Sequence, residues 1–202
     1  MLDEIVLLTG EVEAPFLGDL LRRFNPALDI RHAETAEELV GICAEPTQHD
    51  GERRLIAFCT GVIVPASVLD GLPGPAYNFH PAPPSYPGSH PASFAVYEGA
   101  GLYGVTVHEM TAKVDDGTIV AVEWFDMPPN PRFTDVEILA YKKLVEIFSS
   151  LAERLATDPT PLPPTGDAWF GPKRTKRDFE RMGEFTEEMD EEEIKRRFRA
   201  FG

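Results

Sequence analysis

The stretch Tyr77–Gly99, YNFHPAPPSYPGSHPASFAVYEG, decides how this chain folds, because it joins an apolar strand to helix-like sequence through a proline-rich loop. Asn78 and His80 stand one residue apart where the apolar segment ends. Side chains at positions i and i+2 of a strand point to the same face. We therefore expect Asn78 and His80 to face one cleft while Phe79 packs into the core.

The sequence on either side of this stretch alternates between strand-like and helix-like patterns. Strand patterns occupy residues 4–10, 28–33, 53–60, 75–79, 103–110 and 118–127, and helical patterns occupy residues 14–26, 35–44, 91–99 and 134–156. The alternation predicts an α/β fold, a Rossmann-like, mostly parallel, twisted sheet with helices on both faces. The last two strands predict antiparallel or mixed pairing at one edge.

Capping patterns and apolar stripes predict where the helices begin. Thr35 with Glu38, and Thr134 with Glu137, have the spacing of a capping box. The long helix carries one apolar stripe, formed by Val136, Ala140, Leu144, Ile147, Leu151 and Leu155.

The chain divides into a main domain, residues 1–157, and a short C-terminal extension, residues 158–202. The extension begins with a Pro/Gly-rich segment, 157–175, that predicts an extended connector. A final helix is predicted over 187–201, with Ile194, Phe198 and Phe201 on one face. That face could pack on a second copy, so a homodimer is one expectation.

Composition narrows the functional classes. The chain has 202 residues, 43% of them apolar, and a net charge of −15, which argues against a large nucleic-acid footprint. The basic run at 173–177 is followed by acidic residues and is interpreted as a solvated linker, with contact to an anionic substrate as the alternative. We expect a cytoplasmic protein with no membrane partner, because apolar runs are short and the N-terminus is acidic. Cys43 and Cys59 are expected to be buried free thiols.

The polar groups around the opening stretch suit acyl-transfer chemistry without a covalent nucleophile. His80 titrates near neutral pH, the Asn78 amide can donate to an oxyanion, and an aspartate from another loop could orient the imidazole. A strand-end Asn-x-His pair can also do no more than cap a loop. A metal site is a further alternative, with His80, His90, His108 and Asp115 as ligands, although no pair has the i, i+4 spacing of a zinc motif.

The segments NFHPAPPSYPG and VTVHEMTAKVDDGTIV resemble the folate-dependent formyltransferases, and the resemblance covers about Ile5 to Phe148. The shared pattern is Asn-x-His, a proline loop ending in glycine, and a later aspartate two residues before a glycine, here Gly117. The resemblance implies the formyltransferase fold and a catalytic triad of Asn78, His80 and Asp115, with Asp115 rather than Asp116 in the triad.

The same resemblance implies 10-formyltetrahydrofolate as a co-substrate and no metal. It assigns pterin binding to backbone groups of Val62 and Val64 and to the apolar walls of Val62, Ile63 and Val64, with a second pterin loop that includes Thr111 and Val114. On the acceptor side we place Pro81, Gly88 and His90, although no family pattern gives His90 a role.

Departures from the family pattern bear on the acceptor. Glu11 and Glu13 stand where the glycinamide ribonucleotide enzymes bind phosphate, which disfavours that acceptor. The extension resembles that of the sugar N-formyltransferases. Trp169 and Phe170 could stack on an acceptor ring or pack on the domain. A tight proline turn would favour a cis bond between Pro83 and Pro84.

The function that these patterns imply is formyl transfer from 10-formyltetrahydrofolate to the amine of a small acceptor, an amino sugar nucleotide. Two alternatives stay open: hydrolysis of 10-formyltetrahydrofolate, and a folate-binding domain without turnover.

Overall fold

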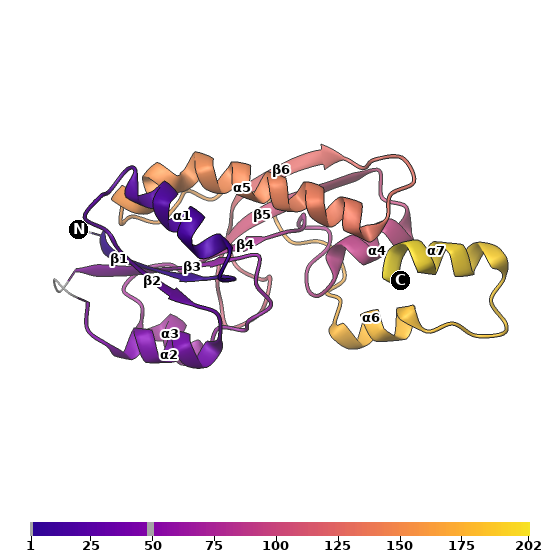
Figure 1. The fold of residues 1–202 in the computed structure, drawn as a ribbon, viewed down its shortest axis with the longest axis horizontal. Coiled ribbons are helices and arrows are strands. Elements are labelled where there is room, and N and C mark those ends of the chain that lie inside the picture. Colours follow the sequence, from indigo (N-terminus) through magenta and orange to yellow (C-terminus); the bar gives the residue numbers. More distant parts are fainter. Residues whose placement is uncertain (1, 48–50) are drawn as a thin grey trace.

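A six-stranded sheet in the order β2-β1-β3-β4-β5-β6 organises the chain (Figure 1). The computed structural model describes residues 2–47 and 51–202. The strands are β1 (Leu2–Leu8), β2 (Asp29–Ala33), β3 (Glu52–Phe58), β4 (Tyr77–His80), β5 (Leu102–Glu109) and β6 (Ile119–Asp126). The first four strands pair in parallel, and β5 and β6 continue the sheet antiparallel. Both the mostly parallel sheet and its antiparallel edge are confirmed.

Helices pack on both faces of the sheet, as predicted. The helices are α1 (Glu13–Arg22), α2 (Ala36–Ala44), α3 (Ala66–Gly71), α4 (Pro91–Glu98), α5 (Phe133–Thr157), α6 (Lys176–Gly183) and α7 (Glu191–Phe201). Figure 1 shows α1 and α5 on one face and α2 and α3 on the other. The larger core cluster includes Leu17 of α1 and Leu144 of α5, and the smaller cluster includes Leu39 of α2 and Val68 of α3.

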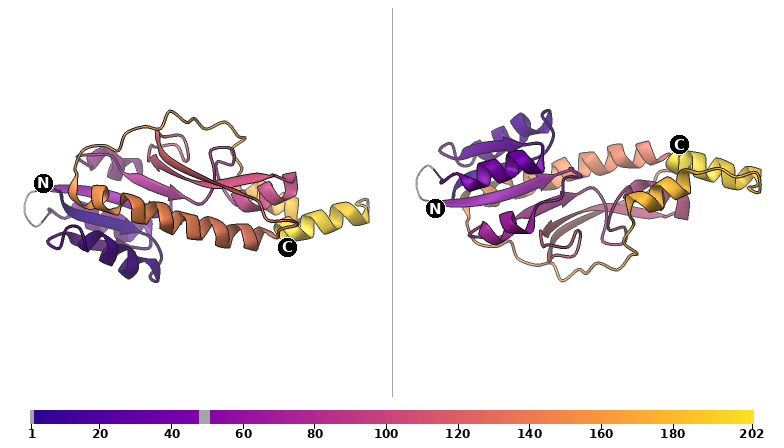
Figure 2. Two further views of the ribbon diagram at one scale, coloured as in Figure 1. Left: turned by 90° about the horizontal axis from the view of Figure 1, so that it is seen from above. Right: turned by 90° about the horizontal axis from the view of Figure 1, so that it is seen from below.

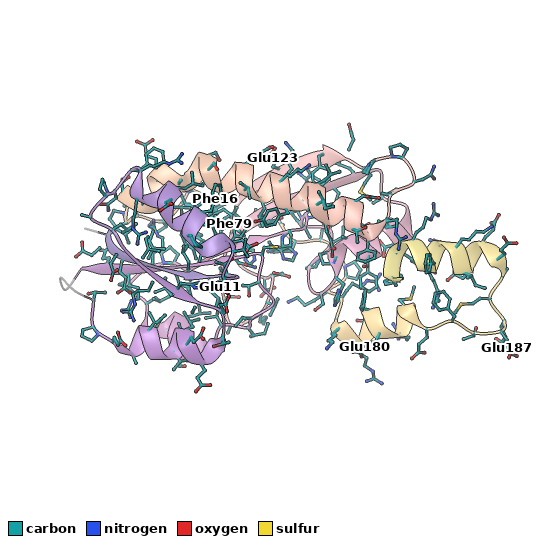
Figure 3. All side chains as sticks on the ribbon, viewed as in Figure 1. Glu11, Phe16, Phe79, Glu123, Glu180 and Glu187 are labelled. Carbon is teal, nitrogen blue, oxygen red and sulfur yellow. The ribbon has the colours of Figure 1, made fainter. Side chains whose placement is uncertain are left out.

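Strand β4 separates core residues from polar residues by simple alternation. Phe79 is fully buried, and its ring centroid lies 5.0 Å from that of Phe148 on α5 and 5.9 Å from that of Phe58 on β3. Figure 3 shows Phe79 inside the body of the protein, whereas Glu180 and Glu187 lie on the outside of the C-terminal lobe. Because neighbouring side chains of a strand point to opposite faces, Asn78 and His80 lie on the face away from α5.

Loops cover that second face over β4 and β5. The β5–β6 loop begins beside the start of β4, where the Met110 N–H donates to the Ala76 carbonyl at 2.7 Å. The connector that follows α5 passes round to the same face, and the Thr165 N–H donates to the Ile119 carbonyl at 3.0 Å (Figure 2). The polar side of β4 is therefore enclosed by chain segments that are distant in sequence.

The helix boundaries agree with the predicted caps at α2 but not at α5. The Thr35 hydroxyl and the Glu38 carboxylate form the predicted capping box. The Thr134–Glu137 box is wrong, because the backbone is extended at Arg132 and α5 begins at Phe133. Asp135 is then the third helical residue, and its carboxylate accepts from the Arg132 N–H at 2.9 Å. The predicted stripe on this helix is buried, except that Leu151 is half-buried.

The C-terminal extension contains a helix that we did not predict. Helix α6 begins after Thr175, whose hydroxyl accepts from the Asp178 N–H at 3.2 Å while the Asp178 carboxylate accepts from the Thr175 N–H at 2.9 Å. The basic run at 173–177 is therefore not a solvated linker, since its last two residues start α6 and Arg174 pairs with Glu98 at 2.9 Å. Helix α7 begins at Glu191 rather than at 187, because Asp190 caps it.

Helix α7 packs on α4 through Phe201. The Phe201 ring lies 5.4 Å from the ring of Phe94 and 5.7 Å from that of Tyr97. Phe201 is thus half-buried, and the exposed part of the predicted apolar face consists of Ile194 and Phe198. The homodimer stays a prediction, as does the division of the chain at residue 157, where α5 ends.

Two local expectations were wrong. No cis peptide bond occurs among the described residues, so the Pro83–Pro84 bond is trans. Cys59 is exposed and Cys43 half-buried, although both are free thiols. Cys59 follows the last residue of β3 with φ at 48°, in the left-handed region, while its N–H still donates to the Phe79 carbonyl at 3.2 Å. In the part of the chain that the structure describes, no helix has the length and apolarity needed to cross a membrane.

Candidate active site

The catalytic, pterin-side and acceptor-side residues proposed from the sequence, apart from Trp169 and Phe170, line one cavity of about 490 Å³. This volume lies within the usual range for small-molecule sites. The residues are Val62, Ile63, Val64, Asn78, His80, Pro81, Gly88, His90, Thr111, Val114 and Asp115. The loop after β3, the end of β4 with its proline loop, and the β5–β6 loop therefore converge, as the sequence predicted.

Asn78 and His108 face each other across neighbouring strands. The register pairs Asn78 of β4 with His108 of β5, and Asn78 Nδ2 lies 3.1 Å from His108 Nε2. His108 Nδ1 lies 2.8 Å from the Glu109 carbonyl oxygen, which can only accept. We therefore assign the proton to Nδ1, so that Nε2 accepts from the Asn78 amide. A primary amide has two N–H groups, and the bond to His108 uses one of them.

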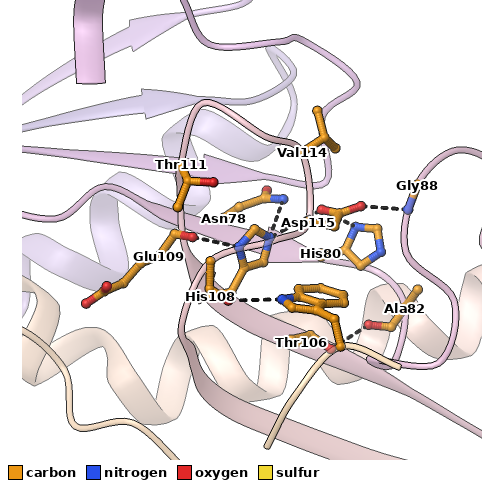
Figure 4. A network of polar contacts seen from close by, with 12 residues as sticks. Asn78, His80, Ala82, Gly88, Thr106, His108, Glu109, Thr111, Val114 and Asp115 are labelled. Atoms are coloured by element: carbon orange, nitrogen blue, oxygen red, sulfur yellow. Dashed lines mark hydrogen bonds and ion pairs between the residues drawn. The ribbon is translucent and has the colours of Figure 1, made fainter. Parts of the chain in front are cut away.

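Asp115 connects the two imidazoles to the proline loop (Figure 4). Its Oδ2 accepts from the Gly88 N–H at 2.7 Å, and its Oδ1 lies 3.3 Å from His108 Nε2 and 3.7 Å from His80 Nδ1. The residue is buried, whereas the side chain of the adjacent Asp116 is half exposed and lies 3.7 Å from Lys113 Nζ. This geometry supports Asp115, not Asp116, as the partner of His80.

The electrostatics of the site favour a neutral imidazole beside a carboxylate. Burial lowers the pKa of His80 below its ordinary value and outweighs the opposing charge of Asp115. Burial alone would raise the pKa of Asp115, but the charge of His80, the His108 ring when its Nε2 carries a proton, and the Gly88 N–H together lower it to about 2. At neutral pH His80 can therefore accept a proton, and Asp115 is charged and placed to stabilise the imidazolium that results.

The sequence identified His108 only as a metal-ligand candidate, yet it contacts both Asn78 and Asp115. The information that would have revealed its role is the antiparallel register of β4 and β5, which a single sequence does not give. Of the four residues of the metal alternative, His80, His108 and Asp115 lie together, whereas the ring of His90 stacks on Phe179. Among the described residues, no group of three or more His, Cys, Asp or Glu side chains could hold a metal ion.

The predicted pterin loops form the other side of the cavity. Val62 and Val64 are half-buried against the smaller core cluster, whereas the Ile63 side chain is exposed. The Val62 N–H already donates to the Thr60 hydroxyl at 3.2 Å, so pairing through that N–H is not available in this conformation. Thr111 and Val114 are exposed at the rim.

The acceptor-side residues are held by the chain around them. The Pro81 carbonyl accepts from the Tyr103 hydroxyl at 3.2 Å. His90 has φ at 53°, in the left-handed region, and its ring stacks on Phe179 with centroids 3.8 Å apart. One face of the His90 ring is thus covered by α6.

Trp169 packs against the imidazoles, so for this residue the structure favours packing over acceptor stacking. Its ring centroid lies 5.9 Å from that of His80 and 5.0 Å from that of His108, and its Nε1–H donates to the Gly117 carbonyl at 2.9 Å. The neighbouring Phe170 is 70% exposed and does not line the cavity, so the structure does not place its ring against an acceptor either.

Gly88 is a position where any side chain should disturb the site. Its φ is +99°, and a Cβ built there would lie 2.1 Å from the Arg174 carbonyl oxygen. We expect Gly88→Ala to destabilise the fold by about 1–3 kcal/mol from backbone strain alone, with a further loss from the clash. Gly99→Ala is the matched control, since φ is +69° but nothing lies within 4 Å of the added Cβ. Denaturant unfolding measures both, and equal losses would contradict the role of the Arg174 contact.

Comparisons with known proteins give the family and the fold of this chain. The family model described as Formyl transferase matches residues 33–138. Methionyl-tRNA formyltransferase from Borrelia duttonii is 33% identical over 91 residues, which cover 45% of this chain and 29% of that enzyme.

Among solved structures, a 4-N formyltransferase from Francisella tularensis superposes with a TM-score of 0.74 at 16% identity, covering 98% of this chain and 88% of that one. An N-formyltransferase from Helicobacter canadensis, solved with folinic acid and dTDP-3-aminofucose, gives a TM-score of 0.72 at 12% identity, covering 100% and 81%. Identities this low establish a shared fold.

The fold and the family match together define the class of this protein. The chain belongs to the formyl transferase family. The match to the curated methionyl-tRNA formyltransferase spans less than a third of that enzyme's length.

Proposed function

We propose that this protein transfers a formyl group from 10-formyltetrahydrofolate to the amine of a small acceptor, an amino sugar nucleotide. The observation that carries the proposal is the grouping of Asn78, His80 and Asp115 in one cavity of the family's fold. The cavity has apolar walls at Val62 and Val64 on one side and the triad on the other, which fits an apolar pterin ring next to a polar reaction centre.

The residues provide one proton acceptor and one neutral donor. As the acceptor nitrogen bonds to the formyl carbon, negative charge develops on the formyl oxygen, and the free N–H of Asn78 stabilises it. Neutral His80 takes the proton that the attacking nitrogen loses, and Asp115 stabilises the imidazolium. His80 then returns the proton to the folate nitrogen as its bond to the formyl carbon breaks, so charge and protons balance.

One acidic side chain of the cavity supports an acceptor that presents its amine there. Glu137 of α5 lines the cavity, and burial raises the pKa of its carboxyl group. Glu13 of α1 lies outside the cavity lining and accepts from the Tyr141 hydroxyl at 3.2 Å. The Glu137 carboxylate opposes a phosphate at this position. The Helicobacter canadensis neighbour was solved with dTDP-3-aminofucose, which makes that compound the first acceptor to try.

The test is to incubate the purified protein with 10-formyltetrahydrofolate and measure tetrahydrofolate release with and without dTDP-3-aminofucose and other amino sugar nucleotides. We expect release only when an acceptor is present, with one formylated product for each tetrahydrofolate. Release without any amine would make the protein a hydrolase. Binding of the folate without release under any condition would make it a binding domain, and either result contradicts the proposal.

A further inference from the structure

A strap of the C-terminal extension, residues 168–175, lies along the proline loop that follows β4. Its backbone is bonded to that loop at three points. The Phe170 N–H donates to the Pro84 carbonyl at 3.2 Å, the Arg174 N–H donates to the Pro87 carbonyl at 3.1 Å, and the Ser89 N–H donates to the Arg174 carbonyl at 2.9 Å. Side chains add to this attachment, since Lys173 contacts the Val114 carbonyl and Arg174 pairs with Glu98.

The strap also fits closely against the loop where it carries glycine. A Cβ built on Gly171 would lie 1.7 Å from the Ser85 carbonyl oxygen. This close approach and the β-bridge between Gly88 and Arg174 fix the distance between the strap and the proline loop. The bonds of Phe170 and Arg174 therefore fix the backbone next to Trp169, in addition to the contacts of its ring.

Trp169 touches three parts of the site at once. Its ring meets the imidazole of His80 at an interplanar angle of 69° and that of His108 at 88°, both edge-to-face arrangements. Its Nε1–H bonds to the carbonyl of Gly117, two residues after Asp115. A single side chain from the extension thus contacts both imidazoles and the loop that carries the catalytic carboxylate.

We propose that Trp169 is a positioning residue for the formyl-transfer site. It holds His80, His108 and the Asp115 loop in fixed relative positions, and it keeps water from the side of the imidazoles opposite the cavity. The proposal rests on the proposed function for its kinetic consequences but not for its geometry. Edge-to-face aromatic contacts and one N–H to carbonyl bond give a defined orientation, and small displacements of catalytic groups have large effects on rate.

The groups that face His80 come from three directions. Asp115 approaches from the β5–β6 loop, His108 from β5, and the Tyr86 carbonyl lies 3.5 Å from His80 Nε2 on the proline loop. Trp169 contributes no charge. Its removal should therefore act on His80 by admitting water, which raises the pKa of the imidazole toward its ordinary value.

The experiment compares Trp169→Ala, Trp169→Phe and Phe170→Ala, with Trp169→Leu as a substitute if the alanine variant does not fold. Steady-state kinetics give kcat and KM, and NMR titration of the histidine rings gives the pKa of His80 independently of turnover. Phe170→Ala is the matched control, because Phe170 sits on the same strap with its ring mostly in solvent.

We expect Trp169→Ala to lower kcat by about 10- to 100-fold, with KM for the folate little changed and the His80 titration moved to higher pH. Trp169→Phe should recover most of the rate, to within about tenfold of the wild type, because it keeps a ring and loses one hydrogen bond. Phe170→Ala should match the wild type in both readouts.

Unchanged kcat and an unchanged His80 titration in a folded Trp169→Ala or Trp169→Leu variant would overturn the inference. Failure of the proposed function can be distinguished from failure of the Trp169 inference, because the wild-type protein itself would then transfer no formyl group to any amine. In that case the His80 titration still decides whether Trp169 controls the environment of the imidazole.

Discussion

Replacing His80 with alanine is expected to lower kcat by about 100- to 10,000-fold, the largest effect that we predict for any single side chain. This is the range that general acid–base catalysis contributes, and the variant loses the group that accepts the proton and returns it. The fold should survive the change, because the Asn78–His108 bond and the Asp115–Gly88 bond do not involve His80.

Single-turnover measurement of formyl transfer would detect this loss without interference from product release. His32→Ala is a suitable control, because His32 lies on β2 and bonds to the Thr9 carbonyl at 2.9 Å, away from the cavity. Turnover close to that of the wild type in His80→Ala would show that His80 is not the proton acceptor.

Asp115→Asn should have the second-largest effect, lowering kcat by about 100- to 1,000-fold. The amide keeps the shape of the carboxylate and can still accept from the Gly88 N–H, but it cannot balance the charge of an imidazolium. Asp116→Asn is the matched control, since Asp116 is half exposed and pairs only with Lys113 among the ion pairs of the described residues. Similar losses in the two variants would contradict the assignment of Asp115.

The same substitution should change how stability depends on pH. The pKa of Asp115 is about 2 in the folded protein, below the ordinary 3.8, so ionised Asp115 favours the folded state. This contribution is about 2 kcal/mol, fully present above about pH 4 and lost as the pH falls through about 2. Thermal unfolding of wild type and Asp115→Asn should therefore differ at neutral pH and converge toward pH 2. A difference that stays constant with pH would exclude this contribution.

The part of the site that follows from local alternation could be predicted from the sequence. Asn78 and His80 share a face because they are two residues apart on a strand, and Phe79 between them reaches the core. The family resemblance added Asp115 and the loop 62–64, and the cavity contains them all. Local periodicity and a motif of fixed spacing were sufficient for these residues.

The residues that depend on strand register or on irregular backbone could not be predicted in this way. His108 reaches Asn78 only because β5 pairs antiparallel with β4 in one particular register. Trp169 lies in a Pro/Gly-rich segment without periodicity, and its position depends on backbone bonds to a second irregular loop. Helix α6 could have been predicted, because Thr175 and Asp178 have the spacing of a capping box. We interpreted this stretch from its charge instead.

The strap also sets the order in which the site becomes complete as the chain is made. Residues 2–157 contain the six strands and every member of the triad, and they leave the ribosome before the strap because synthesis proceeds from the N-terminus. Until residues 168–175 have followed, the imidazoles lack the cover of Trp169 and face water. A nascent chain can thus bring Asn78, His80 and Asp115 together before it can enclose them, and the cover over His80 is added by a segment that emerges after the triad.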